Sequence, residues 1–171
     1  FFYQNFSDGI QKDNVIFNPT PNLNESRNLK KYFNKIKIYS GNKYLIVPYS
    51  NTKKKINNLG ISFGSSDPKK ISIKILKFLI RMNWNIDTNL FIGFYSKLQK
   101  EIRKIDVPKN IKILKFNNEK FLRSNLAICA PGVSAFELLS QNIFALYVSH
   151  SKKHFNLGKY MEKNYKHSKN L

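Results

Sequence analysis

The chain has 171 residues, of which 42% are hydrophobic and 14% aromatic, and it carries a formal net charge of +20. This composition is typical of a folded domain with its own core and excludes an intrinsically disordered chain. No apolar run approaches the roughly 20 residues that a membrane-spanning helix needs, and the one cysteine, Cys129, excludes an internal disulfide framework. We therefore expect a cytoplasmic protein without a membrane span.

The positive charge has two interpretations. Clustered lysines and arginines are typical of proteins that bind a polyanion such as nucleic acid. Here the excess is almost entirely lysine, which is scattered apart from short runs such as residues 53–55, 69–70 and 152–153, and there are only four arginines. Lysine, asparagine and isoleucine are the residues that an AT-rich genome overproduces. We attribute the charge to codon usage and do not expect nucleic acid as the partner, but a basic nucleic-acid-binding α/β module stays open as the alternative from another class.

Residues 1–50 differ from the rest of the chain. A short strand is predicted at residues 14–18, ended by the Pro-Thr-Pro-Asn breaker at residues 19–22, and a second apolar run covers residues 44–48. The sequence between these runs is polar, and the chain begins without Met or a signal peptide. We expect this part to be the remnant of a preceding domain with a linker, and the chain to be a fragment of a longer protein.

From residue 51 onward, predicted strands alternate with predicted helices. In the helix after the first strand, Ile71, Ile75, Phe78, Leu79 and Met82 share one helical face. The alternation predicts an α/β fold with a Rossmann-like parallel sheet over residues 51–163, followed by a polar tail at 164–171. The predicted strands are 59–63, 89–94, 111–116, 126–130 and 143–148, and the predicted helices are 71–82, 98–105, 119–123, 133–141 and 153–163.

Two glycine turns occupy matching places in this pattern. Gly64 lies in the segment 61–68 (ISFGSSDP) and Gly132 in the segment 126–137 (LAICAPGVSAFE), each after an apolar run and before a helix. A helix N-terminus has unpaired N–H groups and a positive dipole end, which together attract phosphate. Both turns follow strands, where ligands of parallel sheets bind. Two such turns in one small domain predict a nucleoside-diphosphate site.

Each turn also has a purely structural interpretation. Ser66 or Asp67 is a favoured N-cap, with Pro68 in the first helical position. Ser134 and Glu137 have the spacing of a capping box, in which the two side chains satisfy two N–H groups of the helix. The functional alternative gives Glu137 to a ribose diol, because a carboxylate accepts from both hydroxyls.

Neither a metal site nor a catalytic group is apparent in the sequence. His150 and His154 have helical spacing, but no carboxylate ligand lies near them, and His167 lies in the polar tail. No nucleophile with a matching base is recognisable, and we assign no catalytic residue, no metal and no cofactor.

The two loops together resemble a known family. Segment 61–69 resembles the ISFGGSDP segment of the UDP-sugar hydrolases of pseudaminic acid biosynthesis, and segment 127–137 resembles the same family's Gly-Gly-Ser/Thr-x-x-Glu loop. More distantly, both resemble the nucleotide-binding half of the peptidoglycan-precursor N-acetylglucosaminyl transferase. Residues 42–48 resemble the phrase that leads into that half, so the resemblance covers roughly residues 13 to 163.

The resemblance implies an enzyme of two Rossmann-like domains, the GT-B fold, in which this chain is the C-terminal, UDP-binding half. It implies a UDP-sugar substrate, no cofactor, and a separate N-terminal domain that carries the catalytic histidine. Serines of the first loop would face phosphate, the second loop would form the second phosphate turn, Glu137 would hold the ribose, and the uracil would lie near Phe116. The substrate-binding residues are then Gly64, Ser65, Ser66, Gly93, Phe116, Asn117, Gly132, Val133, Ser134, Glu137 and Asn156.

Three positions depart from the family pattern. Ser65 replaces the second glycine of the first loop, Ala135 stands where a hydroxyl residue is common, and Lys152–Lys153 replace a Gln near the sugar, although Asn156 fits a following Asn. The main hypothesis is therefore the UDP-binding half of a UDP-amino-deoxy-sugar hydrolase. A GT-B glycosyltransferase that uses a UDP-sugar donor is the alternative on the same scaffold.

Overall fold

The computed structural model describes residues 15–18, 37–40, 57–165 and 168–170. The chain divides into two compact units, Phe1–Val47 and Pro48–Leu171. In the first unit, strand β1 (Val15–Asn18) pairs in parallel with strand β2 (Lys37–Ser40). The first of these strands agrees with the strand predicted at 14–18, whereas the second has no counterpart among the predicted elements. The apolar run at 44–48 lies outside the described residues.

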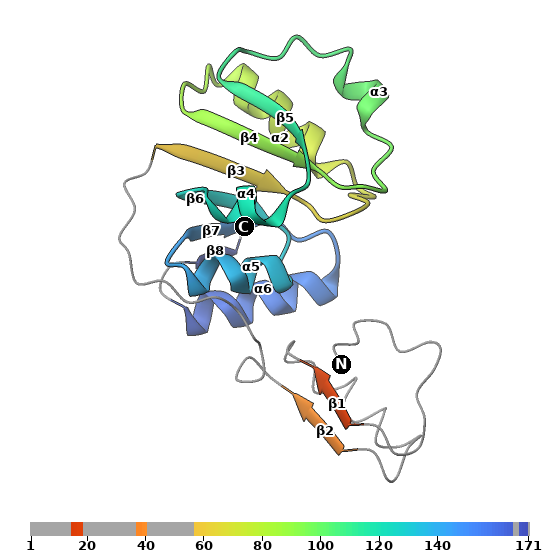
Figure 1. Ribbon diagram of the computed structural model, residues 1–171, viewed down its shortest axis with the longest axis vertical. Helices are drawn as coiled ribbons and strands as arrows, with labels where there is room; N and C mark the ends of the chain where they lie inside the picture. Colours follow the sequence, from red (N-terminus) through yellow and green to blue (C-terminus); the bar gives the residue numbers. More distant parts are fainter. Residues whose placement is uncertain (1–14, 19–36, 41–56, 166–167, 171) are drawn as a thin grey trace. The chain divides into compact units, whose positions relative to one another are not determined.

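The second unit is built on a six-stranded sheet in which every neighbouring pair is parallel (Figure 1). Its strand order is β5-β4-β3-β6-β7-β8. This arrangement confirms the predicted Rossmann-like α/β fold. The strands are β3 (Asn58–Ser62), β4 (Asp87–Ile92), β5 (Ile111–Lys115), β6 (Leu126–Cys129), β7 (Phe144–Tyr147) and β8 (Ser168–Asn170).

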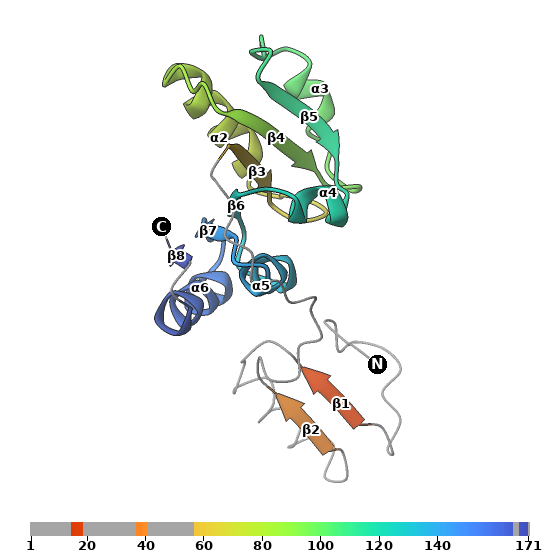
Figure 2. The same ribbon diagram turned by 60° about the vertical axis from the view of Figure 1, so that its left-hand side comes forward.

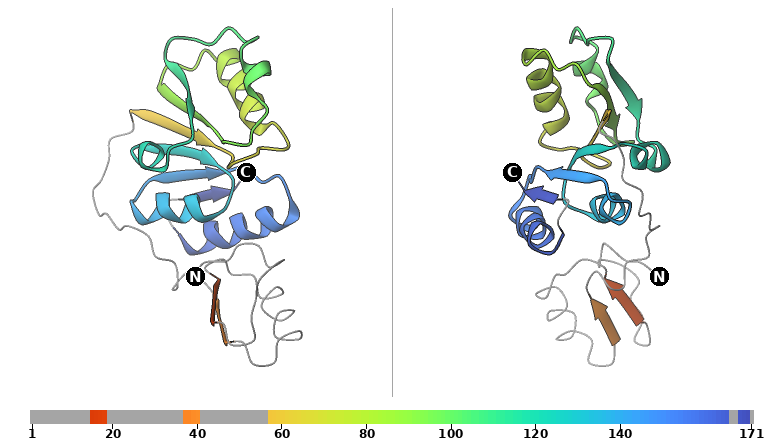
Figure 3. Two further views of the ribbon diagram at one scale, coloured as in Figure 1. Left: turned by 45° about the vertical axis from the view of Figure 1, so that its right-hand side comes forward. Right: turned by 90° about the vertical axis from the view of Figure 1, so that its left-hand side faces the viewer.

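Helices cover both faces of this sheet. Helix α2 lies on one side and helices α4 and α5 on the other (Figures 2 and 3). Helix α3 is a single turn, shorter than the predicted helix 98–105. The helices are α2 (Ile71–Arg81), α3 (Gln99–Ile102), α4 (Asn118–Leu122), α5 (Val133–Ser140) and α6 (Lys152–Asn164).

The core forms between the central strands and helix α2. Leu59 and Leu90 of the sheet and Leu76 of the helix are fully buried, as expected for a strand covered on both faces. The five apolar residues that share one face of this helix in the sequence are not all buried, because Phe78 and Met82 are exposed. The buried residues of this helix are instead Ile71, Ser72, Ile73, Leu76 and Leu79.

The segment predicted as a polar tail contains a short strand, β8. Ser168–Asn170 pairs in parallel with β7 at the edge of the sheet. The segment is polar, so no apolar pattern signals it, but an edge strand needs only backbone partners. Asn170 also packs on helix α6, where a Cβ at Gly158 would lie 2.4 Å from its Oδ1 atom. His167 lies outside the described residues. Within the described ranges, no helix is long and apolar enough to cross a membrane.

Candidate functional site at the carboxyl edge of the sheet

The two glycine turns lie side by side because their strands are neighbours. In the β3–β6 pair, Ser62 lies opposite Cys129, and Gly64 and Gly132 follow these residues within three positions. The strand order also reverses here, since the chain moves outward through β4 and β5 and then returns to β6. Open α/β sheets bind ligands in the crevice at such a switch point, outside the carboxyl ends of the strands. The topology therefore places both turns at the expected ligand-binding edge.

The first helix begins at the start of its predicted range, 71–82, and not at Pro68, where the capping interpretation would start it. The N-cap residue of helix α2, Lys70, has the left-handed φ of 52°. The buried carboxylate of Asp67 accepts hydrogen bonds from the N–H groups of Ile71 and Ser72, each at 2.9 Å. Two N–H groups of the first helical turn are thus occupied by the chain's own anion. The capping interpretation of this loop is correct, with Asp67 as the capping residue.

The exposed turn before this helix is held by the loop after β4. Gly64 has a φ of +77°, a left-handed conformation that favours glycine, and Ser65 and Ser66 are exposed. A Cβ at Gly93 would lie 2.2 Å from the Gly64 carbonyl oxygen, and the Tyr95 N–H donates to the Ser65 carbonyl at 2.9 Å. Gly93 therefore allows the two loops to approach each other, and its contact with the substrate stays a prediction.

The loop after β4 also presents two exposed aromatic rings, which the sequence analysis did not single out. Phe94 is 85% and Tyr95 74% exposed, and their rings meet edge-to-face with centroids 5.2 Å apart. Two adjacent aromatic residues at the end of the strand predicted at 89–94 are the signal that was available. They add apolar surface beside the Ser65–Ser66 turn.

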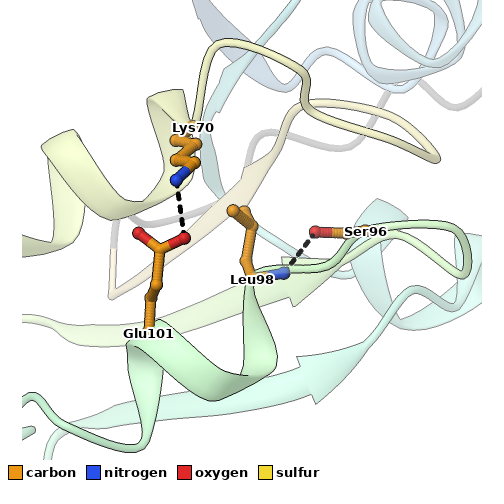
Figure 4. Close-up of polar contacts among 4 residues, drawn as sticks. All are labelled: Lys70, Ser96, Leu98 and Glu101. Carbon is orange, nitrogen blue, oxygen red and sulfur yellow. Dashed lines mark hydrogen bonds and ion pairs between the residues drawn. The ribbon is translucent and has the colours of Figure 1, made fainter.

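A surface ion pair joins the start of α2 to α3. The Lys70 ammonium lies 2.7 Å from a carboxylate oxygen of Glu101, and Figure 4 shows the two side chains pointing toward each other. Beside them, the Leu98 N–H donates to the Ser96 hydroxyl at 3.3 Å. Both members of the ion pair are about half exposed, so its contribution to stability is small. The ion pair therefore directs the positive charge of Lys70 toward Glu101.

The second turn differs from the first, because its helix is open at the N-terminus. Helix α5 begins at Val133 after Gly132, and no side chain among the described residues caps it. Ser134 therefore lies inside the first turn instead of at the cap, and the predicted capping box with Glu137 is wrong. Gly132 is extended, with a φ of 177°. The Ala135 N–H donates to the Gly132 carbonyl at 3.1 Å, whereas those of Val133 and Ser134 have no intrahelical partner and can donate to an anion.

Glu137 lies one turn further along α5 and faces α4. Its Oε1 atom accepts a hydrogen bond of 3.4 Å from the Asn118 side-chain amide. Asn118, which the sequence analysis missed, is the first residue of α4 and follows Asn117 at the carboxyl end of β5. The structure thus brings Glu137 to the predicted base-binding loop. Because a carboxylate has several acceptor positions, one long hydrogen bond leaves it able to accept others.

The two predicted base contacts have different surroundings. The Phe116 ring is 37% exposed and lies against Phe91 and Phe121, with centroid distances of 6.3 and 5.9 Å. Asn117, in contrast, caps α4, since its side-chain oxygen accepts from the Lys120 N–H at 2.9 Å. Phe116 therefore offers a fixed, partly open ring, whereas the Asn117 side chain already has a structural partner.

Helix α6 approaches the second turn from the other side. A Cβ at Gly158 would lie 3.2 Å from the Pro131 side chain, and Asn156 is exposed in the same helix. At the start of this helix, the rings of His150 and His154 are 4.1 Å apart. Burial, then the neighbouring His150 and Lys153, lower the pKa of His154 below its usual value. The protonated form of this imidazole is therefore disfavoured.

The remaining reactive side chain is inert. Cys129 is buried in β6, and burial raises its pKa to about 12, so the thiol is protonated at neutral pH. In the part of the chain that the structure describes, no group of three or more His, Cys, Asp or Glu residues is placed to hold a metal ion. The features that the site offers are backbone N–H groups, Glu137 and aromatic surface, which are binding features.

Comparison with known proteins gives a fold. No family model matches the chain. An uncharacterized protein of Methanocaldococcus jannaschii is 26% identical over an alignment that covers 81% of this chain and 35% of that protein. Among solved structures, Acinetobacter baumannii MurG aligns with a TM-score of 0.59 and 16% identity, over 92% of this chain and 52% of MurG. The glycosyltransferase SnogD from Streptomyces nogalater aligns with a TM-score of 0.48 and 10% identity, over 73% of this chain and 32% of SnogD.

The chain thus spans about half of MurG and about a third of the archaeal relative. The likeness to MurG, together with the six-stranded parallel sheet, shows the fold: this chain has the Rossmann-like α/β architecture found in GT-B glycosyltransferases.

Proposed function

We propose that residues 57–165 bind a UDP-sugar as the donor-binding half of a GT-B glycosyltransferase. The observation that carries this proposal is the uncapped N-terminus of helix α5 at the switch point of the sheet, with Glu137 one turn further on. In the proposed complex, the N–H groups at Val133 and Ser134 donate to the diphosphate. The helix dipole adds to this attraction.

The ribose and the base follow from the positions of the other groups. Glu137 accepts from the ribose hydroxyls, while its hydrogen bond from Asn118 fixes the carboxylate toward the loop after β5. The base lies against Phe116, whose ring is held by Phe91 and Phe121. The order phosphate, ribose and base thus runs from α5 toward β5.

Transfer to an acceptor is favoured over hydrolysis because this chain shares its fold with MurG and because both loops resemble the nucleotide-binding half of the peptidoglycan-precursor N-acetylglucosaminyl transferase. Hydrolysis remains the second candidate, because segment 61–68 resembles the first loop of the UDP-sugar hydrolases. The described residues present binding groups only, and we place the catalytic group that would separate the two reactions in a further domain of the whole protein.

Calorimetric titration with UDP and with AMP tests the proposal. We expect saturable binding of UDP that persists when the salt is raised from about 50 to about 200 mM, and no comparable binding of AMP. Glu137→Ala removes charged hydrogen bonds to the ribose, so the affinity for UDP should fall by roughly 10- to 100-fold. Glu119→Ala is the matched control, since Glu119 is an exposed carboxylate on α4 that pairs with Arg123.

Three results would contradict the proposal. Equal affinity for UDP and AMP, with binding that disappears at the higher salt concentration, would leave only a basic surface. That result would support the nucleic-acid-binding alternative. Unchanged UDP affinity in Glu137→Ala, with the fold intact by circular dichroism, would remove the ribose assignment. An equal loss in Glu119→Ala would show that any acidic side chain near this edge has the same effect.

A further inference from the structure

The outer face of helix α2 has a composition that the nucleotide site does not explain. Its exposed residues are Lys74, Lys77, Phe78, Arg81 and Met82, which follow the i, i+3, i+4, i+7, i+8 spacing of one continuous stripe. The side chains of Phe78 and Met82 are 50% and 59% exposed. We name these five residues the α2 stripe. It contains three cations and two large apolar side chains.

The charge of this stripe is not balanced by its own helix. The sequence of α2, ISIKILKFLIR, contains no Asp or Glu. The Arg81 guanidinium lies 5.7 Å from the centre of the Phe78 ring, so cation and apolar surface are presented together. Helix α6 offers a contrast: Phe155 and Lys159 also form such a contact, but Glu162 follows them and pairs with Lys169.

Apolar side chains flanked by cations match an anionic lipid surface. The cations are attracted to acidic headgroups, and the apolar groups enter the boundary between headgroups and acyl chains. A second copy of this chain would bring the same positive stripe into contact with itself, which is unfavourable. A polyanion such as nucleic acid would satisfy the cations but gives an exposed Met82 no apolar partner.

We propose that the α2 stripe docks on the surface of a membrane that contains anionic lipids. Lys74, Lys77 and Arg81 supply the electrostatic attraction, and Phe78 and Met82 insert at the interface. The stripe belongs to the outer surface of α2, whereas the proposed nucleotide site uses α5 and the loop after β5. Membrane docking therefore does not depend on the proposed nucleotide binding, and each can fail alone.

Vesicle sedimentation with the full chain tests this proposal. The vesicles are phosphatidylcholine alone, or phosphatidylcholine and phosphatidylglycerol in equal parts. We expect binding to the anionic vesicles only, with an affinity that falls as salt is raised. Replacing Lys74, Lys77 and Arg81 by Gln should lower this affinity roughly 100-fold, because each cation near an anionic surface contributes about fivefold. Phe78→Ser with Met82→Ser should lower it about tenfold.

The matched control replaces three exposed lysines elsewhere, Lys104, Lys109 and Lys112, by Gln and so removes the same charge. We expect this control to stay within about threefold of the wild-type affinity. The proposal is overturned by any of three results: absence of binding to anionic vesicles, an equal loss in the control, or full binding by the Phe78/Met82 variant. Thermal unfolding of each variant verifies that all of these exposed changes leave the fold intact.

Discussion

Asp67 occupies the N–H groups that an anion would need at the first glycine turn, and replacing this residue tests that difference between the two turns. Asp67 is 4% exposed, and its carboxylate accepts hydrogen bonds of 2.9 Å from two N–H groups of helix α2. A hydrogen bond to a charged group contributes about 1.5–3 kcal/mol, and removal of a capping side chain costs about 0.5–2 kcal/mol. Asp67 also has a positive φ of 41°, which alanine adopts at a further cost of about 1 kcal/mol.

We therefore expect Asp67→Ala to lower the free energy of unfolding by about 3 kcal/mol, allowing for water that replaces part of the lost hydrogen bonding. Asp67→Asn keeps one acceptor oxygen and tolerates the left-handed backbone, so its loss should be about 1 kcal/mol. Urea unfolding at constant m-value measures both changes. Asp106→Ala, at an exposed carboxylate, is the control and should stay within about 0.5 kcal/mol of the wild type.

The same variants separate capping from ligand binding. Because Asp67 faces its own helix, Asp67→Asn should leave the affinity for UDP within about threefold of the wild-type value wherever the protein stays folded. If Asp67→Ala is as stable as Asp106→Ala, the carboxylate does not cap α2. The N–H groups of α2 would then be as open as those of α5, and the distinction between the two turns would be refuted.

Three further predictions follow from burial and close approach. In the same urea assay, Gly93→Ala should lower the free energy of unfolding by about 1–3 kcal/mol, because its Cβ would lie 2.2 Å from the Gly64 carbonyl oxygen. Gly132→Ala should lower it by under about 0.5 kcal/mol, because no described atom lies within 4 Å of its Cβ. Cys129 should resist a thiol reagent in the folded protein at pH 8, since burial raises its pKa to about 12, and it should react once urea unfolds the protein. Rapid reaction of the folded protein would contradict this prediction. His154 has a pKa below 6.5 when folded, so the unfolded chain takes up more protons and stability should fall as pH drops through 6.5; His154→Gln should flatten this dependence, and identical pH profiles would refute it.

Most of the fold was predictable, because strands and helices of the second unit have strong apolar patterns. The missed strands are β2 and β8, of four and three residues. Ser168–Asn170 is entirely polar and becomes a strand through its backbone bonds to β7. The apolar spacing of α2 does not show that Phe78 and Met82 are exposed, since an apolar residue at helical spacing is not always buried. Edge-strand pairing and the exposure of single apolar residues depend on tertiary contacts, which a local sequence pattern does not contain.

The location of the site was predictable from the sequence, but the different roles of its two glycine turns were not. In the sequence, the two turns have equivalent glycines, capping residues and following helices. The structure distinguishes them because Asp67 reaches four and five residues ahead to Ile71 and Ser72, which moves the start of α2 beyond Pro68. Ser134 makes no such cap, since α5 begins one residue before it. A shift of one to three residues in a helix start lies within the ordinary uncertainty of sequence patterns.

The geometry of α5 gives the proposed binding mode its strongest internal consistency. From Val133 and Ser134 to Glu137 the helix advances by about one turn, roughly 5 Å, which is the scale of one sugar ring between a diphosphate and a base. Glu137 is in turn linked to the start of α4 through Asn118, so two chain segments meet along this line. The first turn then has a structural role. The N–H groups at the start of α2 donate to Asp67, and the backbone of the turn packs against Gly93. If nucleotide binding is found, it should depend on α5 far more than on α2.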